Sequence, residues 1–292
     1  MGRDPAQLVQ EAQQQRETAL ANHRAWEERT GFKLVLALTR NVAVLSQLTT
    51  AQTRAVGTAI ETLTLYLKRT TNSLALTPTR PSRFELMILW EKDSWTKFRQ
   101  VMEGLYSRRQ LGESWQSAEE FNSYDHYIIP HMYETPESIR SRPPTCGSVF
   151  LAARRQINIA TKRRSPFWLS EGFAAYGDYI VHKTNRWYTV DDPSRTPTPG
   201  DWMQEARRLS RDGKLRPWSG LLKRELQDFM PAYYSQAMTI VAFLLESESH
   251  MFLEFVRRLK GGQQQQTALE EAYHLSIDEL EQRGKRWLAG RR

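Results

Sequence analysis

Apolar and polar positions follow different patterns in the two halves of this chain. In the first half, short apolar runs alternate with helical repeats, in which apolar residues recur three and four positions apart. Two of these runs, at residues 32–38 and 84–90, predict buried β-strands. A third run, at residues 127–133, contains Pro130, which cannot donate a hydrogen bond within a sheet, so we predict an edge or interrupted strand there.

Helical repeats cover much of the remaining chain. They predict helices at residues 4–28 and 49–69, a short one from Asp93, one of about 15 residues from Gly147, and then 201–211, 217–228, 232–246, 249–260, 267–274 and 276–288. Three of the predicted helix starts have the residue types and spacing of a capping box. The pairs are Thr49 with Gln52, Thr267 with Glu270, and Ser276 with Glu279. Strands followed by helices alone predict an α+β fold: a small mixed β-sheet with helices and then an all-helical C-terminal lobe.

The stretch at residues 165–179, SPFWLSEGFAAYGDY, is the most distinctive helix of the chain. Ser165 suits a helix cap and Pro166 suits a first turn, and large apolar residues follow at helical spacing. Glu171 stands out in this apolar setting, because a carboxylate is rarely buried without a partner. We therefore expect Glu171 to face a cation, which is a metal ion, an arginine or a lysine.

Composition limits the classes of site that the chain offers. The 292 residues carry a net charge of +8, with Lys and Arg spread along the chain and without a zinc-finger, RNP-type or Gly-rich phosphate motif, which does not favour nucleic-acid binding. A single cysteine, Cys146, rules out an internal disulfide and a multi-cysteine zinc site, and we interpret it as a small apolar filler. The sequence does not indicate an oligomeric state.

Targeting signals add little. No apolar run approaches the length of a membrane span, and the N-terminus lacks the apolar core of a signal peptide. We expect a cytoplasmic protein if Met1 is the native start, and an exported one if a leader has been removed.

The distinctive helix resembles one motif of the gluzincin, or peptidase-MA-like, metallopeptidases, above all their bacterial members of unknown function. The matching pattern is W-L-x-E-G-x-A-x-Y, formed here by Trp168, Leu169, Glu171, Gly172, Ala174 and Tyr176. The resemblance implies that Glu171 holds the place of a zinc ligand. It also implies that Tyr233, with Tyr234 as the other candidate, holds the place of a tyrosine that stabilises an oxyanion.

The preceding helix departs from that family. It should carry H-E-x-x-H, whose histidines bind zinc while the glutamate activates water, but it contains VFLAARRQINIA. No histidine lies between His131 and His182, and no acidic residue lies between Glu137 and Glu171. We therefore expect no catalytic residue, no bound metal and no cofactor, and a remnant site of Glu171, Tyr233, Arg155 and Arg154, in which an arginine pairs with Glu171 in place of the metal.

These observations divide the chain into three parts and favour one function. We expect an N-terminal helical extension at 1–30, an α+β peptidase-MA-like subdomain with both motif helices at 31–190, and a helical C-terminal subdomain at 191–292. The expected function is an inactive metallopeptidase-like domain that acts as a binding or scaffold module, with a peptide or protein in the old cleft.

Two alternatives remain open. The first is an active metal-dependent peptidase or hydrolase with a rearranged site, in which zinc recruits other imidazoles such as His126 and His131. The second is a basic protein that binds anions or nucleic acid, with the cluster Lys162, Arg163 and Arg164 as its candidate surface.

Overall fold

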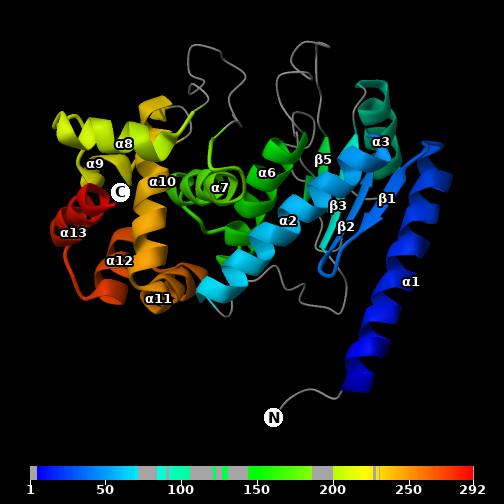
Figure 1. Cartoon of the computed structure of the whole chain (residues 1–292), viewed down its shortest axis with the longest axis horizontal. Coiled ribbons are helices and arrows are strands. Elements are labelled where there is room, and N and C mark those ends of the chain that lie inside the picture. Colours follow the sequence, from blue (N-terminus) through cyan, green and yellow to red (C-terminus); the bar gives the residue numbers. More distant parts are fainter. Residues whose placement is uncertain are drawn as a thin grey trace. The chain divides into compact units, whose positions relative to one another are not determined.

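A computed structural model describes residues 5–71, 84–89, 92–105, 121–122, 127–130, 144–185, 200–225, 228–229 and 231–291 (Figure 1). The chain forms two compact units. The sheet unit comprises Met1–Thr62 and Leu76–Ser148, and the helical unit comprises Leu63–Ala75 and Val149–Arg292. The expected α+β class is confirmed, with a mixed sheet near the N-terminus and a mostly helical part after it. The three-part division at residues 30 and 190 stays a prediction.

The sheet unit contains a mixed sheet. Its strands are β1 (Val35–Leu38), β2 (Val42–Ser46), β3 (Phe84–Leu89), β4 (Phe121–Asn122) and β5 (Tyr127–Pro130), in the spatial order β1-β2-β3-β5-β4. Strands β2, β3 and β5 are parallel to one another, whereas β1 and β4 pair antiparallel with their neighbours. Strand β2 was absent from the predicted elements, since only a tight turn separates its apolar run from that of β1.

Of the two alternatives predicted around Pro130, the edge strand was wrong, and the interrupted strand stays a prediction. Strand β5 lies between β3 and β4. Pro130 is its last residue and pairs with Leu89 of β3, while Phe121 and Asn122 of β4 pair with Ile128 and Tyr127. Proline lacks the N–H donor of a sheet ladder, so it is tolerated better at the end of a strand than in its middle.

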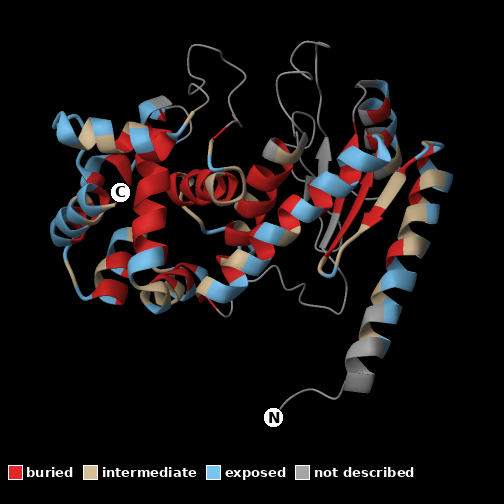
Figure 2. Ribbon diagram, in the orientation of Figure 1, coloured by how far each residue is buried: buried red, intermediate tan, exposed pale blue. Residues whose placement is uncertain are grey.

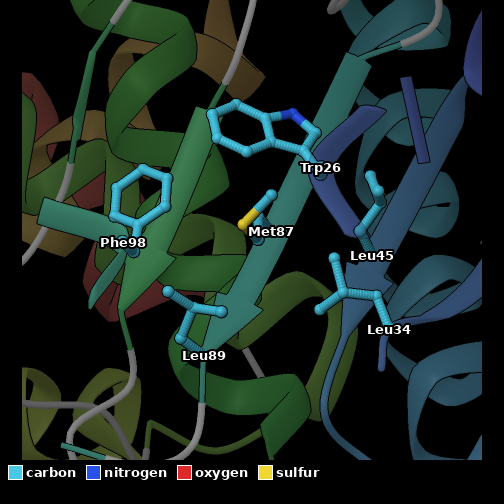
Figure 3. Packing of buried hydrophobic residues seen from close by; sticks show 6 residues of the cluster. All are labelled: Trp26, Leu34, Leu45, Met87, Leu89 and Phe98. Carbon is cyan, nitrogen blue, oxygen red and sulfur yellow. The ribbon is translucent and has the colours of Figure 1, made fainter. Parts of the chain in front are cut away.

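Helices cover both faces of the sheet. Helices α1 (Pro5–Thr30) and α3 (Lys92–Leu105) pack on one face, where Trp26, Leu34, Leu45, Met87, Leu89 and Phe98 form a buried cluster (Figure 3). The rings of Trp26 and Phe98 lie 5.5 Å apart. Helix α2 (Thr50–Thr71) packs on the other face through its first turns, where Thr53 hydrogen-bonds Ser46 of β2. A short sheet thus gains a core on both faces.

The helical unit is built around two buried helices, α7 (Phe167–His182) and α10 (Pro231–Ser247) (Figure 2). The remaining helices are α6 (Pro144–Ala160), whose first turn belongs to the sheet unit, α8 (Trp202–Arg211), α9 (Trp218–Leu221), α11 (Ser249–Lys260), α12 (Gln265–Tyr273) and α13 (Ile277–Gly290). The helix predicted at 217–228 is therefore much shorter. One reason is that the carbonyl of Leu222 accepts a hydrogen bond from the side chain of Gln265 rather than continuing a helix.

Two of the predicted capping boxes are confirmed. Thr49 Oγ1 accepts from the backbone N–H of Gln52, whose side chain accepts from the backbone N–H of Thr49. Ser276 and Glu279 make the same reciprocal pair at the start of α13. Each pair satisfies two N–H groups that a helix leaves unpaired at its start.

Two other predicted starts were wrong. Helix α12 begins earlier than expected, and Gln264 caps it by accepting from the N–H groups of Gln266 and Thr267. Helix α7 begins after Pro166, whose carbonyl accepts the first bonds of the helix, and Ser165 Oγ makes no hydrogen bond within the described residues. Among the helices that the structure describes, none is long and apolar enough to cross a membrane.

Candidate functional site around Glu171

Glu171 lies on the buried part of α7, which runs from Trp168 to Asp178. Its side chain is 1% exposed, and Nη1 of Arg154 on α6 lies 3.3 Å from its Oε1. The Arg154 side chain is 20% exposed, so the pair sits at the boundary between core and solvent. The predicted pairing of Glu171 with an arginine of the preceding helix is therefore confirmed for Arg154. A buried carboxylate requires such a partner, because leaving it alone would cost several kcal/mol of desolvation.

The turn of α6 that precedes Arg154 is apolar, whereas Asn158, one turn after it, accepts a hydrogen bond from Ser170 Oγ of α7. Phe150 lies four residues earlier, on the same side of the helix, and Leu151 follows it; both side chains are buried. No oxygen, sulfur or imidazole group accompanies Arg154 at these two positions. Of these three positions, only Arg154 can interact with the Glu171 carboxylate as a cation and a hydrogen-bond donor.

Arg155 and Gln156 follow Arg154 and are more deeply buried, with 8% and 4% exposure. Neither amide atom of Gln156 has a hydrogen-bond partner within the described residues. A buried amide without partners costs about 1–3 kcal/mol, so native structures keep few of them. Gln156 was absent from the predicted site residues. The sequence does contain an indication of it, because the helical repeat of α6 assigns this polar residue to the core, directly before Ile157.

Helix α7 meets α10 at a point of unusually close approach. A Cβ atom on Gly172 would lie 2.5 Å from the carbonyl oxygen of Ala237 and 3.0 Å from Val241 Cγ2. Only glycine fits there, because a methyl group cannot overlap a backbone oxygen. The glycine beside Glu171 thus sets the spacing between the two central helices.

Tyr233 lies one turn before Ala237, on the side of α10 that faces α7. It is 8% exposed, and its ring packs edge to face on Phe229 at 5.6 Å. Its hydroxyl group makes no hydrogen bond within the described residues. Tyr234 packs instead on Phe229 and on Trp202 of α8. The structure therefore brings Arg154 and Glu171 together and places Tyr233 on the neighbouring helix α10.

The other residues of the W-L-x-E-G-x-A-x-Y pattern have packing roles. Trp168 Nε1 donates to Gln265 Oε1 at 2.8 Å, and the indole stacks on Phe255. Leu169 and Ala174 are fully buried. Each position of the pattern is thus accounted for by the interior of the helical unit.

Tyr176 ends the pattern in a hydrogen-bonded network. Its hydroxyl lies 2.6 Å from that of Tyr66 on α2 and donates to Glu246 on α10, which Arg291 also contacts. Burial, together with the negative charge of Glu246, raises the pKa of Tyr176 far above its usual value, and burial raises the pKa of Tyr66 as well. Both phenols therefore stay neutral at any physiological pH.

Among the residues that the structure describes, the other candidate groups do not gather into a site. Within the described ranges, no three His, Cys, Asp or Glu side chains lie close enough together to hold a metal ion. His126 and His131, the imidazoles that a recruited zinc would need, lie outside the described residues. Lys162, Arg163 and Arg164 form the exposed turn after α6, and Arg164 Nη1 donates to the carbonyl of Lys260 at 3.0 Å.

Comparison of this chain with protein-family models, with curated proteins and with solved structures finds no match.

Proposed function

We propose that this chain is a catalytically inactive, gluzincin-like metallopeptidase domain that acts as a binding or scaffold module. Its partner would be a peptide or protein, held by the surface that forms the substrate cleft in active members of that family. The observation that supports the proposal is the ion pair between Arg154 and the buried Glu171.

The spacing on α6 supports this proposal. If Arg154 holds the place of the second histidine of H-E-x-x-H, then Phe150 holds the place of the first and Leu151 that of the general base. In that case, none of the three positions carries a zinc ligand or a general base. A catalytic zinc site needs three protein ligands and an open position, and this arrangement keeps only Glu171.

Electrostatics point the same way. The guanidinium group occupies the space that a cation would share with the carboxylate. Two unit charges about 4 Å apart interact by about 4 kcal/mol near a protein surface, and a divalent ion beside Arg154 would be repelled by about twice that. Arg154 therefore both satisfies Glu171 and excludes a metal ion from it.

Zinc content tests the proposal. We expect protein purified without chelators to contain far less than one zinc per chain, and to leave a quenched fluorescent peptide library uncleaved. Stoichiometric zinc that is lost in Glu171→Gln would instead support an active hydrolase with a rearranged site, and would overturn the proposal.

A restoration experiment tests the family assignment separately. The triple variant F150H/L151E/R154H rebuilds H-E-x-x-H on α6, and we expect it to bind one zinc per chain through both new histidines and Glu171. The matched control adds E171Q to the triple variant and should lose most of that zinc. A folded triple variant that binds none would contradict the gluzincin-like arrangement.

A further inference from the structure

A groove runs along the open edge of the sheet, within the sheet unit and apart from Glu171. It has a volume of about 590 Å³ and is lined by residues of α1, β1 and α2 and by the loop residue after β1, among them Arg16, His23, Leu36, Leu38, Thr39 and Arg54. Strand β1 is the outermost strand on this side and lies beside α1 (Figure 1). The groove therefore has a strand edge as its floor and a helix on either side.

The hydrogen-bonding groups of this edge follow from the β1–β2 ladder. The backbone N–H of Thr39 donates to Val42 across the turn, so in an antiparallel pair the groups of residues 35, 37 and 39 point toward β2 and those of 34, 36 and 38 point away. Leu34 agrees with this alternation: its N–H donates to Glu27 Oε1 and its carbonyl accepts from His23 Nε2, both on α1.

Helix α1 covers the edge only at Leu34. For Leu36 and Leu38, no hydrogen bond to the outward N–H and carbonyl groups is present in the part of the chain that the structure describes. An open strand edge of this kind is a template for a further strand. The backbone N–H and carbonyl groups of Leu36 and Leu38 therefore face the groove without a partner among the described residues.

The walls of the groove carry positive charge. Arg16 on α1 and Arg54 on α2 are exposed and make no ion pair with any described residue. Glu27 and Glu61 accept hydrogen bonds from Leu34, and from Thr39 and Asn41, and neither carboxylate lines the groove. The groove thus combines backbone groups that pair with any extended chain and two cations that favour an acidic one.

We propose that this groove binds an extended, acidic segment of a partner protein, which adds to β1 as a further strand. Successive side chains of an added strand point to opposite faces of the sheet, so one faces α1 with Arg16 and the next faces α2 with Arg54. The segment should therefore carry two acidic residues that are an odd number of positions apart, so that one faces Arg16 and the other faces Arg54. A second copy of this chain fits poorly, because pairing two β1 edges would bring like charges together. This inference does not depend on the proposed function of the Glu171 site.

Selection from a random peptide library tests the proposal. Peptides of about eight residues, the length of a typical strand, are displayed on phage and selected on the full chain. We expect enrichment of Asp and Glu at odd spacings. The strongest peptide should protect the amides of Leu36 and Leu38 from hydrogen exchange. R16E/R54E should weaken its binding by at least about tenfold, with weaker binding at higher salt.

The control is R29E/K68E, which makes the same change in net charge at exposed positions outside the groove and should bind as the wild type does. Enrichment without acidic residues, equal weakening by both double variants, or no change in protection at Leu36 and Leu38 would each overturn the proposal. A concentration-dependent dimer that protects the same two amides would also overturn it, since the occupant would then be a second copy.

Discussion

The carboxylate of Glu171 and the guanidinium of Arg154 decide what this region of the helical unit can do. The two residues are 17 positions apart, and they meet because α6 and α7 pack side by side. Arg154 Nη1 lies 3.3 Å from Oε1 of the carboxylate, so the charge of Glu171 has an opposite charge beside it in a buried position. This single contact carries the proposal that Glu171 no longer acts as a metal ligand.

Breaking this pair should destabilise the protein. We expect Glu171→Gln to lower the free energy of unfolding by about 2–3 kcal/mol, because Arg154 then loses its charge partner in a mostly buried position. Urea denaturation followed by circular dichroism measures the change. The matched variants are R154M and E171Q/R154M. A coupling energy near zero in this double-mutant cycle would contradict an energetically significant pair.

A second prediction at the scale of single residues concerns the stability of the variant Gly172→Ala. Gly172→Ala places a methyl group 2.5 Å from the carbonyl oxygen of Ala237, so α7 and α10 must move apart. Alanine gains about 1 kcal/mol in helix propensity, but overpacking typically costs about 1–3 kcal/mol and here involves backbone. We expect a net loss of about 1–2 kcal/mol in thermal or urea unfolding.

Gly220→Ala is the matched control for this substitution. Gly220 lies in the short helix α9, and an added Cβ would meet no atom within 4 Å. We expect its stability to change by no more than about 0.5 kcal/mol, in the stabilising direction. Equal effects of the two substitutions would show that the close approach of α7 and α10 does not matter.

At the scale of elements, the network around Tyr176 joins α2, α7 and α10 to the residue that follows α13. Tyr66 and Glu246 contact the Tyr176 hydroxyl from two different helices, and Arg291 contacts Glu246. Tyr176 is buried, whereas Glu246 is exposed, so the network runs from the core of the unit to its surface. It constrains how the helices pack, because the buried Tyr176 hydroxyl would be costly without a partner.

This network predicts a loss of stability at alkaline pH. The folded-state pKa of Tyr176 and of Tyr66 is raised above the unfolded value of about 10, so the folded state keeps protons that the unfolded state releases. The stability that these groups contribute is fully present below pH of about 10 and falls as the pH rises further. We expect the urea concentration at the midpoint of unfolding to fall steeply above that pH.

Tyr176→Phe provides the control for the alkaline measurement. It removes one of the ionising groups, so the slope of stability against pH above about 10 should become shallower, although the variant is less stable at neutral pH. Absorbance at 295 nm should show that the buried phenols ionise only as the protein unfolds. Full titration of every tyrosine in the folded protein would contradict the burial of Tyr176.

At the scale of the whole molecule, the chain has a net charge of +8, and its Lys and Arg residues are spread along the sequence. Such a distribution produces weak, non-specific attraction for polyanions. We expect a fluorescent single-stranded oligonucleotide to bind no more tightly than about 10 µM at about 150 mM salt, with affinity falling steeply as salt is added. Tight binding that resists salt would favour the alternative of a nucleic-acid-binding protein.

The sequence by itself determined the class of the fold and the positions of most helices. Those features depend on residues within one or two turns of each other, as in the boxes Thr49–Gln52 and Ser276–Glu279. It also determined that Glu171 needs a cation and that the preceding helix lacks H-E-x-x-H, because both follow from residue types alone.

Only the tertiary structure decided which cation Glu171 meets, how closely Gly172 approaches Ala237, and where the sheet ends. Strand β2 escaped prediction because only a tight turn separates its apolar run from that of β1. The position of β5 escaped prediction because its pairing partners come from distant parts of the chain, and local periodicity does not encode them. The exposed edge of β1 is likewise a result of strand order. The physical reason is the same throughout: spacing along the chain sets which face a residue occupies, whereas packing decides what that face touches.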